Sequence, residues 1–366
     1  MPSFKTRPWR LISVLLLLLS GCLHTAPGQA GYGEKVRVLI LKSSGSFDLR
    51  GTDRGELHIR YSGAESASVN GRLKRLPMKL YPEDEFVYIN GRPYRGTVEV
   101  SAGKGALLVV NEVNMEAYIA GIINNEISSK WPEDVIKSQA VIARTYALFN
   151  MRKRQNLPYH VESSVMGQVY SGASVEDNAA IKAVQATAGE ILVFDGEPAL
   201  TVYHSNAGGM TDSAREIWRR DYPYLLPVES PFDASAPKYE WEFALPAESF
   251  KGLLSSGGLP ALTPQEITVL DTTSAGRVKL IALRDGSGKE ARLSGEELRG
   301  AVGYSNLRST FFAVEKDGDR FIFKGRGSGH GVGLSQWGAK GMAENGYSYR
   351  EILDHFYPGT ELTRAW

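Results

Sequence analysis

The sequence predicts an α+β protein in which a β-rich N-terminal region precedes a mixed helix and strand core with an inserted α+β subdomain. Three observations predict this class. Short apolar runs separated by turn residues fill positions 36–110, a helical period begins at Asn114, and helices and strands then alternate without an internal repeat. With 366 residues, 42% of them hydrophobic, the chain is long enough to bury a substantial core.

Charge and metal-ligand content exclude several functional classes. Lys and Arg total 42 against 41 Asp and Glu, so no net positive field favours a nucleic-acid partner. The six histidines and one cysteine show no paired-His, HExxH or CxxC spacing, which zinc sites normally require. We therefore expect no metal and no cofactor.

The N-terminus has the pattern of a secretion signal. Three basic residues precede an apolar run at 11–19, which is short for a membrane span of roughly 20 residues. The run ends Leu-Ser-Gly-Cys, which resembles a lipobox, and Cys22 is the only cysteine. We expect a lipoprotein signal peptide at 1–21 and an anchor and linker at 22–34. The alternative is an ordinary cleavage site with an incidental Cys22.

A lipid on Cys22 would hold the protein on a membrane, because several acyl chains together bind stably. The expected location is the cell envelope of a bacterium, anchored to a membrane. Leu23, rather than aspartate, follows the cysteine and favours the outer membrane facing the periplasm.

The N-terminal region is predicted to consist of strands. Gly, Asn and Asp punctuate its apolar runs, as hairpin connections require, and Asn70-Gly71 and Asn90-Gly91 are typical two-residue turns. The expected strands are 36–41, 56–61, 78–81, 98–101 and 107–110.

Two helices are predicted next, joined by a tight turn. Asn114 is a good N-cap, Glu126 lies in the last turn of the first helix, and Pro132 begins the second. Apolar residues around Glu126 would raise its pKa toward that of a general acid, although a glutamate at a helix end is more often solvated surface. The apolar stripe of the first helix consists of Met115, Tyr118, Ile119, Ile122, Ile123 and Ile127.

The remaining chain is predicted as a helix at 175–187, strands at 191–194 and 199–203, and a mixed section at 241–302. This last section contains a helix at 248–254 and strands at 267–270 and 277–283. We interpret it as a subdomain.

Residues 325–338 form the densest motif of the chain. Five glycines alternate from Gly325 to Gly333, and this spacing allows close approach of the backbone to a ligand. The stretch lacks the Gly-Lys-Ser/Thr of a P-loop and never matches GxGxxG or GxSxG, so nucleotide-binding and α/β-hydrolase readings fail. The side chains it presents, His330, Ser335, Gln336 and Trp337, are suitable groups for a sugar.

A second polar motif, His204-Ser205-Asn206, ends a strand and precedes two glycines. Adjacent residues of a strand point to opposite faces, so His204 and Ser205 do not form a hydrolase dyad. The motif either lines a site or is a glycine turn with a capping Asn.

These segments together resemble the sporulation stage II protein D and LytB family, which comprises peptidoglycan lytic transglycosylases and amidase enhancers. They keep the family order over roughly 98–360, and we assign 35–366 to one domain of this type with a subdomain at about 241–302. The matching stretches are 113–121, 125–127, 131–132, 137–147, 168–172, 203–205 with 208–209, 308–310, 325–341, 352–353 and 357–359.

The resemblance implies that Glu126 is the catalytic acid and base of a lytic transglycosylase. One carboxyl group then protonates the glycosidic oxygen and deprotonates the muramic C6 hydroxyl, which attacks C1 to give a 1,6-anhydro product. The implied substrate is the glycan of peptidoglycan stripped of stem peptides. The alternative function is a noncatalytic glycan-binding enhancer of an N-acetylmuramoyl-L-alanine amidase, which is then a partner.

The residues expected to line the substrate groove around Glu126 are Arg144, Tyr146, His204, Ser205, His330 and Gln336. Three departures from the family pattern limit the resemblance. Ala207 stands where many relatives have a cysteine, and the segment 161–168 lacks the Cys and His that some relatives carry there, so their zinc or disulfide is not carried over. Ser328 stands where the loop often has an aromatic residue.

Overall fold

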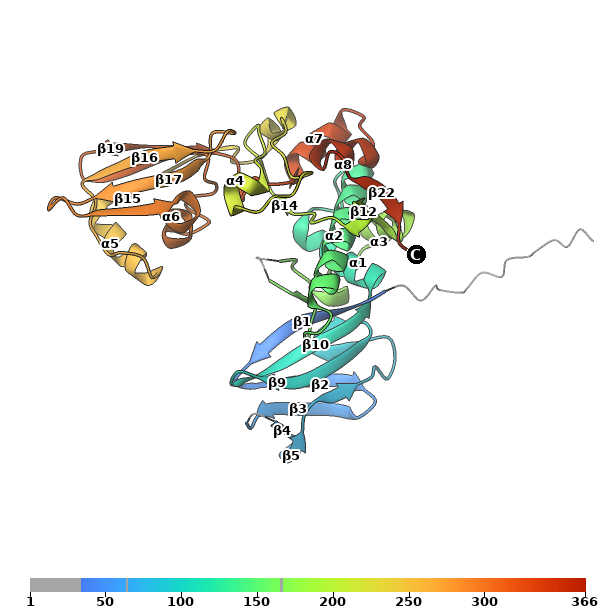
Figure 1. Ribbon diagram of the computed structural model, residues 1–366. Coiled ribbons are helices and arrows are strands. Elements are labelled where there is room, and N and C mark those ends of the chain that lie inside the picture. The colour runs from blue at the N-terminus through green and yellow to red at the C-terminus, as the bar shows by residue number, and fades with distance from the viewer. Residues whose placement is uncertain (1–33, 64, 165–166) are drawn as a thin grey trace, which may run out of the picture. The chain divides into compact units, whose positions relative to one another are not determined.

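The computed structural model describes residues 34–63, 65–164 and 167–366 (Figure 1). The expected signal peptide, the lipid-attachment residue Cys22 and nearly all of the linker lie outside the described residues. The chain is 28% helical and 37% strand, with a β-rich N-terminal region and several sheets. The predicted α+β class is confirmed.

Two sheets make up the N-terminal region. The first has the order β11-β1-β10-β9-β6 and the second β5-β4-β3-β2-β7-β8. Both hairpin turns predicted from Asn-Gly pairs occur, with positive φ at Asn70 and Gly71 and at Asn90 and Gly91. The strands are β1 (Lys35–Ser43), β2 (Ser46–Thr52), β3 (Gly55–Tyr61), β4 (Ser66–Val69), β5 (Arg72–Arg75), β6 (Met78–Leu80), β7 (Val87–Ile89), β8 (Arg92–Tyr94), β9 (Thr97–Gly103), β10 (Ala106–Asn114) and β11 (Val161–Glu162).

The main hydrophobic core joins these sheets to the helices that follow. Helix α2 is largely buried and contacts four other helices, α1, α3, α7 and α8. The elements outside the two N-terminal sheets are α1 (Met115–Glu126), α2 (Glu133–Arg154), η1 (Gly172–Val175), α3 (Asn178–Ala186), β12 (Glu190–Phe194), β13 (Glu197–Pro198), β14 (Tyr203–His204), α4 (Ala214–Trp218), η2 (Pro231–Ser235), β21 (Leu334–Ser335), α7 (Gln336–Glu344), α8 (Tyr349–Phe356) and β22 (Glu361–Arg364).

Small sheets connect distant parts of this core. Strand β12 lies between β13 and the C-terminal strand β22, and β14 pairs in parallel with β21. The β14–β21 pair brings the His204 motif beside the end of the glycine-rich loop, so the two polar motifs of the sequence lie together.

A second hydrophobic core is built from residues 241–323, a stretch that includes the expected subdomain. Its sheets have the orders β15-β20-β19 and β16-β17-β18. Its elements are β15 (Glu240–Pro246), α5 (Ala247–Ser256), β16 (Glu266–Thr272), β17 (Val278–Arg284), β18 (Glu290–Ser294), α6 (Gly295–Val302), β19 (Phe312–Asp317) and β20 (Arg320–Arg326).

Within the part of the chain that the structure describes, no helix is both long and apolar enough to cross a bilayer.

Candidate functional site

Glu126 is the last residue of α1 and stands at the turn before α2, as the sequence predicts. The helix begins where Asn114 caps it, because the Asn114 side chain accepts a 2.9 Å hydrogen bond from the Glu116 N–H. It ends because Ile127 turns to an extended conformation while its N–H still bonds to the Ile123 carbonyl at 2.9 Å. The carboxylate is thereby fixed at a corner of the main core.

The Glu126 carboxyl group is half-buried and holds one defined hydrogen bond. Its Oε1 accepts from the Val169 N–H at 3.0 Å, whereas Oε2 has no hydrogen-bond partner among the described residues. Burial raises the pKa of Glu126 above its ordinary value, and the Val169 N–H and the Tyr203 hydroxyl oppose that rise. The Tyr203 hydroxyl itself is buried and forms no hydrogen bond of normal geometry within the described structure.

Buried phenols surround this carboxyl group. The Tyr118 hydroxyl donates to Gln168 Oε1 at 3.0 Å, and Gln168 Nε2 donates to the Ala143 carbonyl at 3.3 Å. Burial, reinforced by the charge of Glu126, raises the pKa of both Tyr118 and Tyr203 far above the ordinary value of 10.0. Both phenols therefore stay neutral and remain hydrogen-bond donors.

Tyr146 lies beside this group at the surface. It is half-exposed and, together with Gln168, lines a cavity of about 180 Å³. Its phenol is close enough to affect the pKa of Tyr118 and Tyr203. The structure thus places Tyr146 near the two buried phenols, Tyr118 and Tyr203.

His330 reaches Glu126 through Tyr203. The His330 Nε2–H donates to the Tyr203 carbonyl at 2.9 Å, while Nδ1 accepts from the Val332 N–H at 3.1 Å. Burial lowers the pKa of His330 to about 4, so the ring is neutral at neutral pH. His330 therefore holds the backbone of the residue whose hydroxyl faces Glu126.

His204 lies behind the loop, inside the core. It is 5% exposed, its ring centroid is 5.3 Å from that of His330, and its Nδ1–H bonds to the Val332 carbonyl at 3.2 Å. Burial lowers the pKa of His204 well below 6.5, so this ring is also neutral. The alternation expected along a strand holds, since Tyr203 and Ser205 are half-exposed on either side of it.

The glycines of the loop serve packing inside the protein. A Cβ at Gly329 would lie 2.6 Å from the His204 Cβ, and one at Gly331 would lie 2.3 Å from the Arg277 guanidinium. The expected close approach of backbone to a ligand is thus an approach to other parts of this chain. Positive φ angles occur at Gly327 (77°), Gly329 (111°), Gly331 (84°) and Gly333 (71°).

Arg277 fills the space that Gly331 leaves open. It precedes β17, is fully buried, and donates from Nη2 to the Ala207 carbonyl at 2.6 Å. Its Nε lies 4.0 Å from Asp212, which also accepts a 2.5 Å hydrogen bond from Thr273. Burial lowers the pKa of Arg277 to about 10, which leaves it charged at neutral pH. A residue outside the main core thereby supports the loop that carries His330.

The structure does not bring Arg144 to the expected groove. Its guanidinium is fully buried, pairs with Glu116 through Nε at 3.0 Å and Nη2 at 2.5 Å, and donates to the Glu190 carbonyl at 2.9 Å. Glu116 lies in the first turn of α1 and Glu126 ends the helix, so roughly 15 Å of helix separates the two. The physical reason is that Arg144 lies on the face of α2 that packs into the core.

Gln336 and Ser205 have different surroundings. Gln336 is 7% exposed and donates to Gln139 of α2 at 3.3 Å, so it joins α7 to α2. Ser205 is half-exposed, and its carbonyl accepts from the Trp337 N–H at 3.1 Å. Ser335, expected at the surface of the loop, is fully buried and donates to Asp233 at 2.5 Å.

Two tryptophans form an exposed aromatic pair near the end of α1. The rings of Trp131 and Trp337 are half-exposed and meet edge to face, 5.0 Å between centroids. The ammonium group of Lys340 lies 5.2 Å from the Trp337 ring. Trp131 follows Glu126 by five residues in the chain, and the backbone N–H of Trp337 bonds to the carbonyl of Ser205, two residues after Tyr203.

Sequence reasoning missed Tyr118 and Tyr203 as site residues. Tyr118 was placed in the apolar stripe of α1, where it belongs, but its hydroxyl points to Gln168. The alternation along β14 was the available signal for Tyr203, because it places Tyr203 opposite the buried His204.

The family follows from comparison with known proteins. Residues 103–194, which include Glu126, match the family described as Stage II sporulation protein. An uncharacterized protein of Brachyspira hyodysenteriae is 32% identical over 275 residues, which are 75% of this chain and 73% of that protein. Stage II sporulation protein D of Bacillus amyloliquefaciens is 28% identical over 271 residues, 70% of this chain and 76% of that protein. The chain belongs to the sporulation stage II protein D and LytB family.

Two further matches cover other parts of this chain. The amidase enhancer of Bacillus subtilis is 28% identical over 88% of this chain, which spans about half of that protein, 50%. Residues 218–333, which include His330, match a domain of unknown function. Membership in the sporulation stage II protein D and LytB family gives the chain a role related to the cell wall.

Proposed function

We propose that the protein is a lytic transglycosylase that cleaves the glycan strands of peptidoglycan, stripped of stem peptides, to 1,6-anhydro-muramic products. Glu126 is the general acid and base. The observation that carries this proposal is the half-buried Glu126 carboxyl, whose pKa burial raises and whose Oε2 has no hydrogen-bond partner among the described residues. A raised pKa keeps a fraction of the acid form available at pH values where a solvated glutamate is ionised.

The reaction uses one carboxyl group twice. Protonated Glu126 donates from Oε2 to the glycosidic oxygen, and the bond from that oxygen to C1 of the muramic residue breaks. The resulting carboxylate then takes the proton of the muramic C6 hydroxyl, whose oxygen bonds to C1. The carboxyl group ends protonated, as it began, and no water is consumed.

The surroundings of Glu126 suit both halves of this cycle. No other carboxyl group contributes to its pKa shift, as expected where no second carboxylate acts as nucleophile or base. In the ionised intermediate state, the Val169 N–H and the neutral Tyr203 phenol stabilise the negative charge. We assign Tyr203 to this supporting role, with His330 positioning it through its 2.9 Å bond to the Tyr203 carbonyl.

The glycan itself would lie over the half-exposed residues that border Glu126. Trp131 and Trp337 offer ring edges and faces for the apolar sides of sugar rings, and Tyr146 and Ser205 offer hydroxyl groups. Of the groove residues expected from sequence, we retain these last two as substrate contacts and assign His204, Gln336 and Arg144 to support from within.

A second function remains in view because one comparison favours it. The similarity to the Bacillus subtilis amidase enhancer covers 88% of this chain. In this alternative the same surface binds glycan without cleaving it and enhances an N-acetylmuramoyl-L-alanine amidase, which is then a partner. Under either function we propose an envelope location with a lipid anchor at Cys22, facing the periplasm from the outer membrane.

The decisive experiment is digestion of purified peptidoglycan, intact and amidase-stripped, by a chain that starts at Leu23. Both hydrophobic cores are built from Val36 onward, so this chain keeps every described element. Products are identified by mass spectrometry. The variants are Glu126→Gln and, as a matched control, Glu83→Gln, which is exposed and in no ion pair among the described residues.

We expect anhydro-muramic products from stripped glycan, reduced roughly 10²- to 10⁴-fold by Glu126→Gln and unchanged by Glu83→Gln. Absence of cleavage with retained glycan binding in all three proteins would contradict the enzyme. Stimulation of a purified amidase by both wild type and Glu126→Gln would then establish the enhancer.

A further inference from the structure

A basic cavity lies far from Glu126 in the sequence, where the chain passes from the edge of one N-terminal sheet to the edge of the other. Strand β5 is an edge of the second sheet, and β6, which follows it, is an edge of the first. Two adjoining hollows of about 430 and 320 Å³ open there and share Arg54, Lys74 and Met78. We call these two hollows the β5–β6 cavity.

Several basic side chains that line the β5–β6 cavity have no acidic partner among the described residues. Arg54, Arg72 and Lys74 line it and are in no ion pair among the described residues, and no lining residue is acidic. The two further basic residues of the lining are partly neutralised, because Lys79 binds Glu112 at 3.2 Å and Arg75 lies 4.0 Å from Glu65. Three free positive charges therefore converge on one opening.

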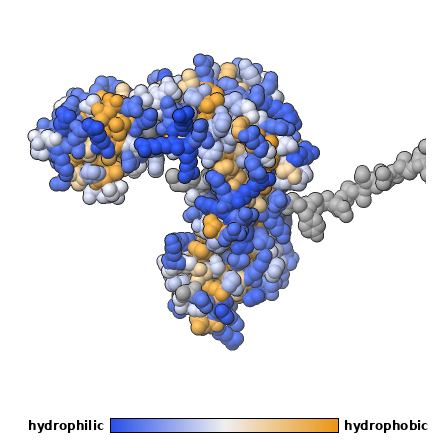
Figure 2. All heavy atoms as spheres, in the orientation of Figure 1, coloured by the Kyte–Doolittle hydropathy of each residue, from blue (hydrophilic) through white to orange (hydrophobic). Residues whose placement is uncertain are grey.

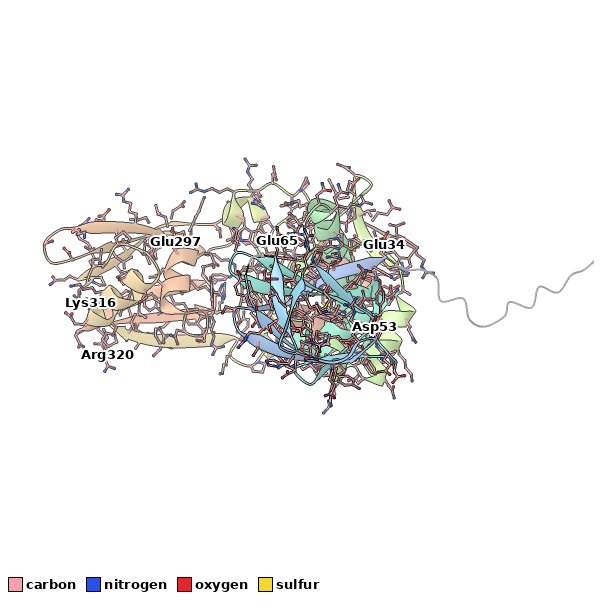
Figure 3. The ribbon with its side chains drawn as sticks, turned by 90° about the horizontal axis from the view of Figure 1, so that it is seen from below. Glu34, Asp53, Glu65, Glu297, Lys316 and Arg320 are labelled. Carbon is pink, nitrogen blue, oxygen red and sulfur yellow. The ribbon has the colours of Figure 1, made fainter. Side chains whose placement is uncertain are left out.

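Two acidic residues that bond to lining residues, Asp53 and Glu65, do not themselves line the cavity. The Asp53 carboxylate accepts a 3.0 Å hydrogen bond from the Tyr81 N–H, and Glu65 is the partner of Arg75. Figure 3 shows Asp53 and Glu65 on opposite sides of the N-terminal strands. The cavity thus keeps its positive charge.

The floor of the β5–β6 cavity is apolar. Leu57, Val69 and Met78 line it and are each 7% exposed, as parts of the main core. Tyr81, which lines the smaller hollow, is 51% exposed, a high value for a large apolar side chain. Figure 2 shows hydrophobic atoms beside hydrophilic ones at the bottom of the view, around β3 to β5.

Protection of a sheet edge explains only part of this pattern. Charges on an edge strand prevent its pairing with another sheet, and the residues of β5 serve that purpose. Edge protection requires neither charges of a single sign nor a floor of apolar side chains. That combination matches a ligand that carries negative charge next to hydrocarbon.

We propose that the β5–β6 cavity binds the phosphate headgroup of an anionic phospholipid at a membrane surface. The three free cations contact the phosphate, while Tyr81 enters the boundary between headgroups and acyl chains. This contact is independent of any lipid on the chain and of the reaction at Glu126. It would turn the N-terminal sheets toward the membrane.

Co-sedimentation with vesicles tests the proposal, using the chain that starts at Leu23. The vesicles are phosphatidylcholine with and without phosphatidylglycerol. The variant combines Arg54→Gln, Arg72→Gln and Lys74→Gln. A control variant that combines Lys182→Gln, Lys251→Gln and Lys289→Gln removes the same charge from exposed residues that form no ion pair in the described structure.

We expect wild type and control to bind only vesicles that contain phosphatidylglycerol, and added salt to weaken this binding. Each basic residue near such a surface is worth about fivefold, so the cavity variant loses on the order of 100-fold. Equal loss in both variants, or no binding by wild type, would overturn the proposal. The three exposed substitutions leave both cores intact, and a circular dichroism spectrum checks this.

Two further arms separate the sources of the negative charge. Tyr81→Ser should weaken vesicle binding but leave any binding of inorganic phosphate, measured by calorimetry, unchanged. If inorganic phosphate binds the cavity and vesicles do not, the site is for a soluble anion and the membrane proposal is wrong. The same follows if purified peptidoglycan, rather than vesicles, retains wild type and releases the cavity variant.

Discussion

Replacement of Arg144 tests whether this residue holds the core together or contacts substrate. In Arg144→Ala the carboxylate of Glu116 loses its partner, and two carbonyl groups that accept from the guanidinium, those of Glu190 and Val184, lose a donor. Arg144 is fully buried, whereas the Glu116 side chain is 23% exposed. Both the packing and the charge balance of the joint between α1 and α2 are lost.

The expected loss is about 3–5 kcal/mol in the free energy of unfolding, the range measured when one partner of a buried ion pair is removed. A domain is normally stable by only about 5–15 kcal/mol, so the variant should unfold at a much lower urea concentration. Glu116→Gln should have an effect of similar size, because it leaves the buried guanidinium without a countercharge.

Urea unfolding followed by tryptophan fluorescence measures both variants, with Arg152→Ala as the control. Arg152 pairs with Glu197 on the surface, where their side chains are 56% and 70% exposed, and its loss should cost below about 1 kcal/mol. An Arg144→Ala variant that unfolds like wild type but no longer binds glycan would refute the structural role.

Three further predictions concern the site. Burial raises the pKa of Glu126 above the ordinary 4.5, so the folded wild type loses stability as pH rises from 4.5 through that raised pKa. Glu126→Gln should remove this loss. The variant should therefore unfold at a higher urea concentration than wild type at pH 7, but not at pH 4. Tyr203→Phe removes a hydroxyl that lowers the pKa of Glu126, so the alkaline limb of glycan cleavage should move to higher pH, whereas an unmoved limb would exclude Tyr203 from the site. Gly331→Ala places a Cβ 2.3 Å from the Arg277 guanidinium and should lower the free energy of unfolding by about 2–4 kcal/mol and remove most of the activity. The control Gly346→Ala has a similar φ of 88° but open space around the new Cβ, so it should lower the free energy of unfolding by only about 1 kcal/mol.

Local patterns in the sequence predicted the helices best. The cap at Asn114 and the apolar stripe predict the position of α1 correctly. The second helix is expected to begin at Pro132, whereas α2 begins one residue later and Pro132 is its N-cap. Strand β5 was not predicted because all four of its residues are exposed, so no alternation marks it. The expected strand at 199–203 is wrong for most of its length, because residues 199–202 lie between the short strands β13 and β14 and only Tyr203 belongs to a strand.

The candidate site was predictable only where a local signal existed. The position of Glu126 at a helix end could be read from the chain, and the structure agrees. The burial of Arg144 could not be predicted from the sequence, because its partner Glu116 lies 28 residues away. The glycines of the loop were assigned to a ligand, since the sequence shows that space is needed but not which group fills it.

The Arg277 contact limits how this protein can be shortened. Asp212 is fully buried in the part of the chain before residue 241, and the arginine beside it comes from the stretch that forms the second core. A deletion of 241–323 would leave that carboxylate without a countercharge and open a void beneath Gly331. A shortened protein without the inserted section must therefore supply another arginine beside Asp212. Otherwise it needs an uncharged residue in place of Asp212 and a side chain that fills the volume of Arg277.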